Sequence, residues 1–281
     1  MKITVNNYNN KEYELLFDDL IQEIFGFSFE KWLEHKLWDK CYESYSIIKN
    51  EKMLANLCIF KTEMIVNGQK LQALQIGAVC TRKDEQGKGL SKMLMEHVLD
   101  IYKDAPAYLF ANESVVNFYP RFGFKPTQVH SPSIKATVNN PEKAIKLSPG
   151  DKIVKTAVYN RTEHSNTLDC LNTASIQMFH LLMEYSDCIY RLPKSDVIVV
   201  AQKEEETLFI ADIIANKPIT FEQIKTELPF YGIETVEFGF FPDWLNVTPT
   251  WEPVDMDDVM FFTKGKWNLP KAFRFPFTSE T

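Results

Sequence analysis

The sequence contains 281 residues with a formal net charge of −7, and 45% of its residues are hydrophobic and 25% charged. This composition is typical of a folded protein and argues against general disorder, and its acidic balance provides no overall positive field that would hold nucleic acid. The length exceeds what one core usually needs and fits two domains, because domains cluster near about 100–150 residues.

The first eighty residues predict two helices followed by an antiparallel meander. Apolar side chains spaced three and four apart predict a helix that starts at Tyr13, and Gly26 separates it from a second helix over Ser28–Trp38. Asn67-Gly68 is a dipeptide typical of hairpin turns. Alternating apolar residues predict the strands of the meander over 45–48, 53–60, 64–66 and 71–81.

A different order of elements follows the meander. The strand that ends at Thr81 enters a polar loop, and this loop closes with Gln86-Gly87-Lys88-Gly89. Apolar residues then recur at helical spacing from Leu90 to Tyr102. A short buried strand over 107–111 and a short helix over 114–119 complete a βαβα unit. The first half therefore predicts an α/β fold with a mixed sheet.

The second half predicts a partial repeat of the first. Residues 131–151 contain Pro132, Pro141 and Pro149-Gly150, which makes them the most linker-like stretch. Beyond them the order helix, hairpin, strand, helix, strand returns, over 176–185, 196–201, 207–214, 219–228, 234–240 and 258–262. Residues 215–218 join strand to helix without a glycine loop. We therefore expect two domains, 1–135 and 136–281, the second a degenerate copy.

The turn around Gly87 and Gly89 is the main candidate for chemistry. A helix N-terminus carries unpaired N–H groups and a partial positive charge, and glycines ahead of it let the backbone approach a phosphate. A plain tight turn that needs glycine for positive φ is the structural alternative. The spacing does not fit a P-loop. A dinucleotide-binding loop would need a third glycine where Lys92 stands.

Two motifs resemble those of the GCN5-related N-acetyltransferases, the GNAT family. The loop is similar to the family's pyrophosphate loop, Q/R-x-x-G-x-G/A: Gln86 and Gly89 fit, and Ser91 stands where glycine or alanine is usual. Residues 112–124 resemble the family signature N-x-x-A-x-x-F-Y-x-x-x-G-F, with Val115 in place of alanine. The approach to the loop is most similar to the Eis-like branch. The resemblance covers about residues 1–130, and the second half resembles a degenerate GNAT domain.

The resemblance implies tandem GNAT-like domains, each a mostly antiparallel sheet with a splayed parallel strand pair flanked by helices. It implies that acetyl-CoA binds between the strand ending at Thr81 and the strand over 107–111. Backbone amides of the loop would hold the pyrophosphate, and the positive charges of Arg82 and Lys92 would lie near it. The implied cofactor-binding residues are Val79, Thr81, Gln86, Gly87, Lys88, Gly89, Leu90, Ser91 and Asn112.

The implied reaction is direct attack of an amine on the acetyl thioester, which needs a base, an oxyanion donor and an acid for the leaving thiolate. Tyr119 stands where the family often places its acid and is the candidate catalytic residue, with an aromatic core residue as the alternative. The Val79 N–H is the candidate oxyanion donor. The base is not identified. Weak candidates are Glu23, Glu63 and Glu113, and the carboxylate of Thr281, because the C-terminal carboxylate enters the site in Eis-like relatives.

The sequence therefore predicts an acetyl-CoA-dependent N-acetyltransferase whose acceptor is a small-molecule or protein amine. The alternative is a non-catalytic acyl-CoA-binding or regulatory module, which would keep Gly87 and Gly89 but need neither Tyr119 nor a base. The five cysteines and five histidines form no recognised metal motif, so no metal is expected. No targeting or membrane-spanning segment is evident, so we expect a cytoplasmic protein without membrane or nucleic-acid partners.

Overall fold

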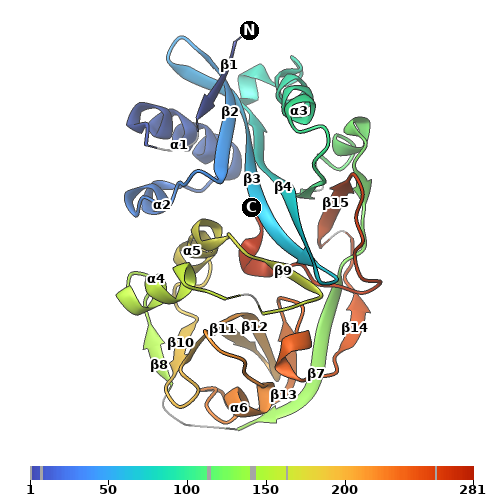
Figure 1. Cartoon of the computed structure of the whole chain (residues 1–281). Helices are drawn as coiled ribbons and strands as arrows, with labels where there is room; N and C mark the ends of the chain where they lie inside the picture. Colours follow the sequence, from blue (N-terminus) through green and yellow to red (C-terminus); the bar gives the residue numbers. More distant parts are fainter. Residues whose placement is uncertain (1, 7–8, 113–114, 140–143, 163, 257) are drawn as a thin grey trace.

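The strands of this protein form two sheets, which lie one above the other in Figure 1. The computed structural model describes residues 2–6, 9–112, 115–139, 144–162, 164–256 and 258–281. The first sheet has the order β1 (Ile3–Asn6), β2 (Tyr42–Lys49), β3 (Lys52–Val66), β4 (Gln69–Thr81), β5 (Ala107–Ala111), β15 (Met260–Lys264) and β6 (Lys125–Pro126), and β9 (Leu168–Cys170) pairs with the far end of β3.

The second sheet has the order β14 (Thr250–Pro253), β7 (His130–Val138), β13 (Ile233–Phe238), β12 (Thr207–Ile214), β11 (Val197–Glu204), β10 (Ile189–Leu192) and β8 (Ile145–Leu147). Each sheet contains one parallel pair, β4 with β5 and β12 with β13. The other strand pairs in the described part of the chain are antiparallel. The predicted fold class, two mixed and mostly antiparallel sheets with a parallel pair each, is confirmed.

Helices cover both faces of the first sheet. The described helices are α1 (Lys11–Phe25), α2 (Glu30–Glu34), α3 (Leu90–Ile101), α4 (Lys152–Tyr159), α5 (Ala174–Met183) and α6 (Phe221–Lys225). Alternate residues of β3 serve the two faces: Cys58 and Phe60 pack with α1, α2 and α5, whereas Leu57 and Ile59 pack with α3. This arrangement explains why β3 is apolar along most of its length rather than alternating. Figure 1 shows α1 and α3 on opposite sides of the sheet.

Most of the predicted helices and strands of the first half are present, with shifted limits. The helix predicted over 114–119 is wrong, because its described residues form no α-helix and the short turn Tyr119–Phe122 follows instead. Helix α1 begins two residues earlier than predicted because the Asn10 side chain accepts a hydrogen bond from the Tyr13 N–H, and it ends at Gly26, which has a φ of +77°. Helix α2 is much shorter than the predicted Ser28–Trp38. The segments predicted as separate strands over 53–60 and 64–66 are one continuous strand, β3.

The stretch that the sequence predicts as a linker is mostly strand. Residues 131–151 contain most of β7 and all of β8, and both lie in the second sheet. Pro132 fits inside β7 because the pairing of β7 with β13 stops at Ser133, and Pro132 is paired only with Trp251 of β14. The linker interpretation was wrong because prolines alone do not exclude a strand at such a position.

The two sheets exchange strands along the chain. Strand β15, predicted as part of the repeat in the second half, lies in the first sheet, where it pairs with β5 along its whole length. Strand β7, which contains the predicted boundary at 135/136, belongs to the second sheet. The division into domains 1–135 and 136–281 remains a prediction, and neither sheet is confined to one side of it.

Candidate functional site

The parallel pair of the first sheet separates partway along its length. Strands β4 and β5 pair only at Leu74, Gln75 and Ile76, opposite 107–109. Beyond this point β5 pairs only with β15, and no described residue pairs with the β5-facing edge of β4. Val79 and Thr81 lie on this open edge and are half-buried. A strand edge of this kind offers backbone groups to an extended ligand.

The glycine turn closes the short loop that follows the open strand edge. Gly87 and Gly89 have φ values of +77° and +80°, a conformation that side chains disfavour. Gly89 is the N-cap of α3 and provides no side-chain acceptor for the amides of the first turn. A Cβ built on either glycine would meet no atom within 4 Å. The glycines are therefore required by the backbone conformation, and the space in front of them is open.

The side chains of the loop hold the turn together. Thr81 Oγ1 and Ser91 Oγ lie 2.7 Å apart, and Gln86 Nε2 donates to the Thr81 carbonyl at 3.3 Å. Lys88 is exposed and pairs with Glu85 at 2.9 Å. Leu90, the first residue of α3, is buried. These contacts leave the backbone amides, rather than the side chains, as the groups that could meet an anion.

Arg82 does not point toward the loop. Its guanidinium is buried and bonds the carboxylates of Asp19 and Glu23 on α1, while Nε donates to the Met53 carbonyl at 2.7 Å. The expectation that Arg82 adds charge near phosphates was wrong, because a tertiary contact with α1 satisfies it instead. The Lys83 N–H and then Arg82 lower the pKa of Glu23. The Glu23 carboxylate therefore accepts hydrogen bonds from Arg82 and from the Lys83 N–H of the loop, and it is not directed at the open edge of β4.

Tyr119 begins the short turn Tyr119–Phe122 and is 5% exposed. Its ring packs against Phe118, Phe124 and Phe262. Burial raises the pKa of the phenol to about 12, and the neighbouring Cys80 thiol is the second cause. Tyr119 belongs to the same hydrophobic cluster against which Val79 of the open part of β4 packs. Among the described residues, none hydrogen-bonds the Tyr119 hydroxyl, so Tyr119 is both a core residue and an available donor.

Asn112 follows β5 directly and is exposed. Its carbonyl accepts from the Val115 N–H at 3.1 Å, which starts the turn toward Tyr119. The weak base candidate Glu113 and the first residue of the helix predicted over 114–119 lie outside the described residues. Lys92 pairs with Glu96 one helical turn further along α3, at 3.7 Å.

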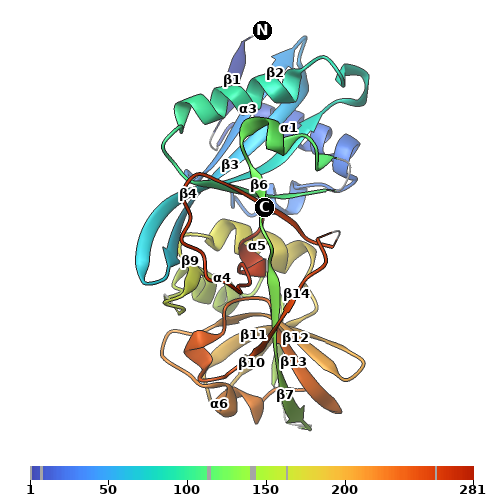
Figure 2. The ribbon, with the colours of Figure 1, turned by 90° about the vertical axis from the view of Figure 1, so that its right-hand side faces the viewer.

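The last residues of the sequence lie between the two sheets, as Figures 1 and 2 both show. The Gln75 side chain on β4 donates to the Ser279 carbonyl at 2.8 Å and accepts from the Thr281 N–H at 2.7 Å. A Cβ on Gly77 would lie 2.5 Å from Thr281 Oγ1. Thr281 thus packs on β4 at the point where β4 and β5 separate. Its chemical role stays a prediction.

Glu280 is half-buried next to this contact, beside Arg274, His180 and Glu184. Its carbonyl lies 2.7 Å from His180 Nε2. Burial raises the pKa of the Glu280 carboxyl to about 7, although the positive charges of Arg274 and His180 oppose the shift. The folded state therefore binds this proton more tightly than the unfolded state does.

We expect Glu280 to make stability depend on pH. Between about pH 4.5 and pH 7 the folded state keeps a proton that the unfolded state has lost, so stability falls as the pH rises through this window. The loss is on the order of 3 kcal/mol when complete. The variant Glu280→Gln should unfold with a flatter pH profile and be more stable than wild type at pH 8. Thermal unfolding at several pH values measures this, with Glu205→Gln in an exposed turn as control. Equal profiles for wild type and Glu280→Gln would contradict it.

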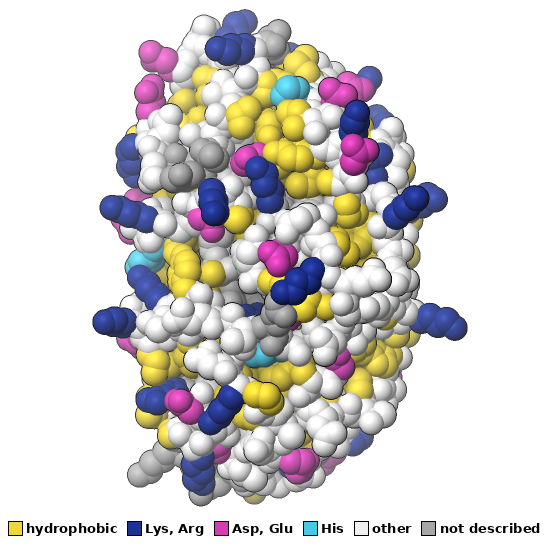
Figure 3. All heavy atoms as spheres, in the orientation of Figure 1, with side chains coloured by type: hydrophobic (Ala, Val, Ile, Leu, Met, Phe, Trp, Pro, Cys, Tyr) yellow, Lys and Arg dark blue, Asp and Glu magenta, His cyan; other side chains and the backbone are white. Residues whose placement is uncertain are grey.

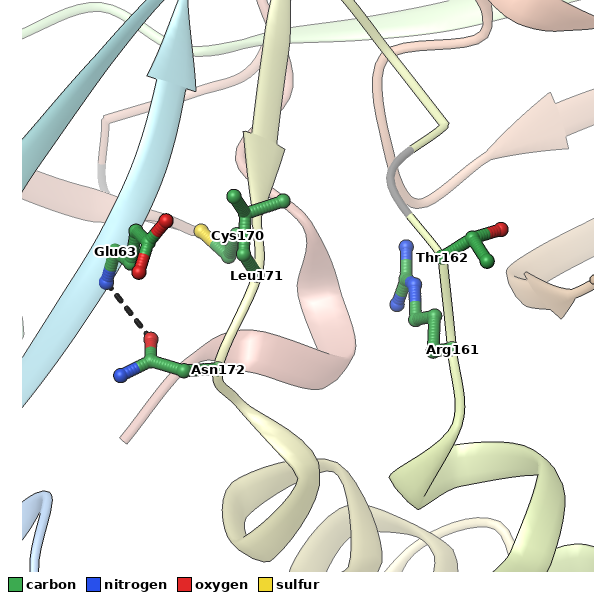
Figure 4. Close-up of a pocket in the computed structure, with 6 residues that line it drawn as sticks. All are labelled: Glu63, Arg161, Thr162, Cys170, Leu171 and Asn172. Carbon is green, nitrogen blue, oxygen red and sulfur yellow. Dashed lines mark hydrogen bonds between the residues drawn. The ribbon is translucent and has the colours of Figure 1, made fainter.

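Glu63 lies elsewhere, in a cavity of about 620 Å³. Figure 4 shows Glu63 and Arg161 extending toward this cavity from opposite walls. Arg161 already bonds Asp169 and Asp212, at 3.4 and 3.1 Å. Glu63 pairs with Gln72 of β4, five residues before Gly77, which is about 16 Å along a strand. Glu63 is therefore too far from the open edge to act there directly.

The described residues form neither a cluster that could hold a metal ion nor a membrane-spanning helix. No group of three or more His, Cys, Asp or Glu side chains in the described ranges is arranged to hold a metal ion. Within the same ranges, no helix combines the length and apolar character that crossing a membrane requires. On the face drawn in Figure 3, basic and acidic side chains are interspersed rather than gathered into a patch of one sign.

Comparisons with known proteins agree with this geometry. Residues 5–127 match the family model described as an acetyltransferase (GNAT) domain. A search of curated proteins finds no match. Among solved structures, a probable N-acyltransferase of unknown function from Enterococcus faecalis V583 is similar with a TM-score of 0.59 and 16% identity, over 94% of this chain and 72% of that one.

Two further solved structures are similar over most of this chain. Eis1 from Mycobacterium abscessus has a TM-score of 0.56 and 13% identity, over 93% of this chain and 73% of its own. A GCN5-related N-acetyltransferase from Kribbella flavida has a TM-score of 0.53 and 14% identity, over 93% of this chain and 70% of its own. At such identities the likeness concerns the fold, and it extends across both sheets.

Proposed function

Because residues 5–127 belong to the GNAT acetyltransferase family, we propose that this chain transfers the acetyl group of acetyl-CoA directly to an amine. The family match supports an acyltransferase that uses acyl-CoA. The acetyl group as the group transferred, the amine as its acceptor and the roles of single residues are our proposal. The observation that supports it most is that a single loop, residues 82–89, connects the open edge of β4 with the uncapped N-terminus of α3. Backbone donors at these two places fit an extended ligand with a diphosphate at one end.

We assign the binding of the cofactor mainly to backbone groups. The amides from Gly87 to Ser91 would hold the pyrophosphate, because the positive φ values of both glycines set the loop in front of α3 and no side chain caps that helix. The edge of β4 at Val79 and Thr81 would pair with the pantetheine arm. Asn112, exposed at the end of β5, would contact the arm from the opposite strand.

Tyr119 is the proposed general acid. With its pKa raised to about 12, the phenol is neutral at physiological pH and is able to donate a proton or a hydrogen bond. Donation to a thiolate of ordinary pKa near 8.5 is uphill in free energy. Tyr119 therefore acts by hydrogen-bonding the developing thiolate as the carbon–sulfur bond breaks, and it completes the proton transfer as charge accumulates on sulfur.

We assign no described Asp or Glu side chain as the base that accepts the ammonium proton where β4 and β5 separate. Glu23 is held by the loop and by Arg82, and Glu63 lies in another cavity. Thr281 lies closest to the required place, against Gly77. The incoming amine would then approach from the α1 face of β4, the side on which Gln75 binds the segment 279–281.

Calorimetry with acetyl-CoA and a CoA-release assay with a panel of amines test the proposal together. The panel would contain spermidine, an aminoglycoside, a lysine-containing peptide and small cationic amines. We expect acetyl-CoA binding and turnover of at least one amine well above the rate of hydrolysis. Binding without turnover of any amine would favour the alternative, a non-catalytic acyl-CoA-binding module. One observation already supports this alternative: no described side-chain carboxylate is assigned as the base. The cytoplasmic location stays a prediction.

A further inference from the structure

A chain of buried polar side chains runs from α1 through β2 and β3 to the Ala78 carbonyl of β4. Ser44 Oγ donates to Asn56 Oδ1 at 2.5 Å, and Tyr13 Oη lies 2.7 Å from both Ser44 Oγ and Ser46 Oγ. Tyr13 is 4% exposed, and the other three residues are fully buried. Such groups gain little net stability over apolar ones, but a fully bonded network fixes its members in one geometry.

This network fixes the orientation of the Asn56 amide. Ser44 has a single hydroxyl proton and donates it to Asn56 Oδ1, so the oxygen of the amide faces Ser44. The Asn56 Nδ2 group therefore faces the other way, where it donates to the carbonyl of Ala78 at 3.1 Å. One side chain of β3 thus holds one particular carbonyl of β4.

The carbonyl that Asn56 holds belongs to a β-bulge. The pairing of β3 with β4 passes from Asn56 opposite Cys80 to Cys58 opposite Gly77. Ala78 and Val79 therefore stand opposite the single residue Leu57, which is the pattern of a bulge. Ala78 has a φ of +46°, which is uncommon for a residue with a side chain. A strained bulge next to a site needs surrounding contacts to hold it.

The Ala78 carbonyl and the Val79 N–H belong to one peptide group. A trans peptide is planar, so its C=O and N–H bonds point in opposite directions. Asn56 lies on β3, and β4 separates β3 from β5. Because the carbonyl points toward Asn56, the Val79 N–H points away from β3, toward the gap where β4 and β5 separate.

We infer that Asn56 is a positioning residue for acyl transfer, which aims the Val79 N–H at the thioester carbonyl by holding the opposite end of the same peptide. This inference rests on the proposed function, since it assigns the target of that N–H. The network of Tyr13, Ser44 and Ser46 holds Asn56 in turn. An oxyanion donor works only where it is fixed before the charge develops, and the bulge alone does not fix it.

The test compares Asn56→Leu with wild type. Leucine has a similar size but cannot donate to the Ala78 carbonyl. We expect kcat with the best amine of the panel to fall about 10- to 100-fold, with little change in acetyl-CoA affinity. Infrared spectroscopy of bound acetyl-CoA labelled with ¹³C at the thioester carbonyl should show a lowered stretching frequency in wild type and a value near that of free acetyl-CoA in Asn56→Leu.

Thr62→Val is the matched control. Thr62 is a fully buried residue of the same strand, and it hydrogen-bonds Tyr108 at 3.0 Å without touching the bulge. It should lose comparable stability while keeping kcat and the carbonyl frequency. If Asn56→Leu does not fold, Ser44→Ala provides the test, because it frees the Asn56 amide to rotate, and we expect a smaller change in the same direction.

The outcomes separate this inference from the proposed function. If both Asn56→Leu and Ser44→Ala keep the wild-type kcat and carbonyl frequency, or if Thr62→Val loses as much of both, Asn56 has no positioning role. If wild type binds acetyl-CoA and shows the shifted frequency but acetylates no amine, the proposed transfer fails, while the orientation of the Val79 N–H by Asn56 stands on the infrared result. If acetyl-CoA does not bind, both fail.

Discussion

Replacing Gly87 and Gly89 together with alanine is expected to weaken acetyl-CoA binding by at least about 100-fold. Both glycines have φ near +80°, and forcing alanine into this conformation costs about 1–2 kcal/mol per residue. A Cβ would meet no atom of the protein at either position, so the loop can relax to a negative φ instead of the chain unfolding. Relaxation turns the amides of the loop away from the diphosphate. Calorimetric titration with acetyl-CoA measures the loss.

Gly68→Ala is the matched control for this experiment. Gly68 also has a φ of +77° and no atom within 4 Å of a built Cβ, but it lies in the hairpin turn between β3 and β4. The control should lose about half as much stability as the double variant, since one glycine is replaced instead of two, and bind acetyl-CoA as wild type does. If the double variant retains wild-type affinity, the loop does not hold the pyrophosphate, and the assignment of the cofactor-binding residues is wrong.

Tyr119→Phe is expected to lower kcat by about 10²- to 10⁴-fold, the usual contribution of a positioned acid, without weakening acetyl-CoA binding. Phenylalanine keeps the ring that packs against Phe118, Phe124 and Phe262, so only the hydroxyl is lost. A fall in kcat with an unchanged dissociation constant identifies an interaction made in the transition state. Steady-state kinetics and calorimetry with acetyl-CoA measure the two quantities.

The pH profile gives a second test of Tyr119. A phenol is protonated below its pKa, and burial raises the pKa of Tyr119 to about 12. An acid with this pKa stays protonated through the whole working range, so kcat of wild type should show no loss at alkaline pH from this group below about pH 11.

Tyr108→Phe is the control for Tyr119→Phe, because Tyr108 is fully buried and its hydroxyl hydrogen-bonds only Thr62 among the described residues. If both variants keep wild-type kcat, Tyr119 is a core residue only.

The sequence alone predicted the local features of the candidate site. Residues 82–102 contain the polar loop, the paired glycines and the apolar residues at helical spacing. Helix α3 begins and ends within one residue of the predicted limits. The open edge of β4 beside β5 followed from the family resemblance. These features depend on residues close together in the chain, where turn chemistry and periodicity are informative.

Other parts of the site depend on residues far apart in the chain. Arg82 precedes the loop by sequence, yet its partners are on α1, so spacing within the loop gave no sign of its buried pairing. Asn56 has the same difficulty, because the residues next to it in the sequence do not show that it holds a bulge on the next strand. A polar residue inside a mostly apolar strand is the signal that the sequence offered.

The sequence by itself determined the βαβ unit of β4, α3 and β5, its glycine turn and the aromatic signature around Tyr119, because short-range φ requirements and apolar periodicity specify them. Only the tertiary structure decided which strands complete each sheet, since β15 pairs with β5 across some 150 residues and β7 crosses to the second sheet. It also decided that Thr281 packs on Gly77. Pairing between distant strands depends on the burial and hydrogen bonding of the whole chain, which no local pattern contains.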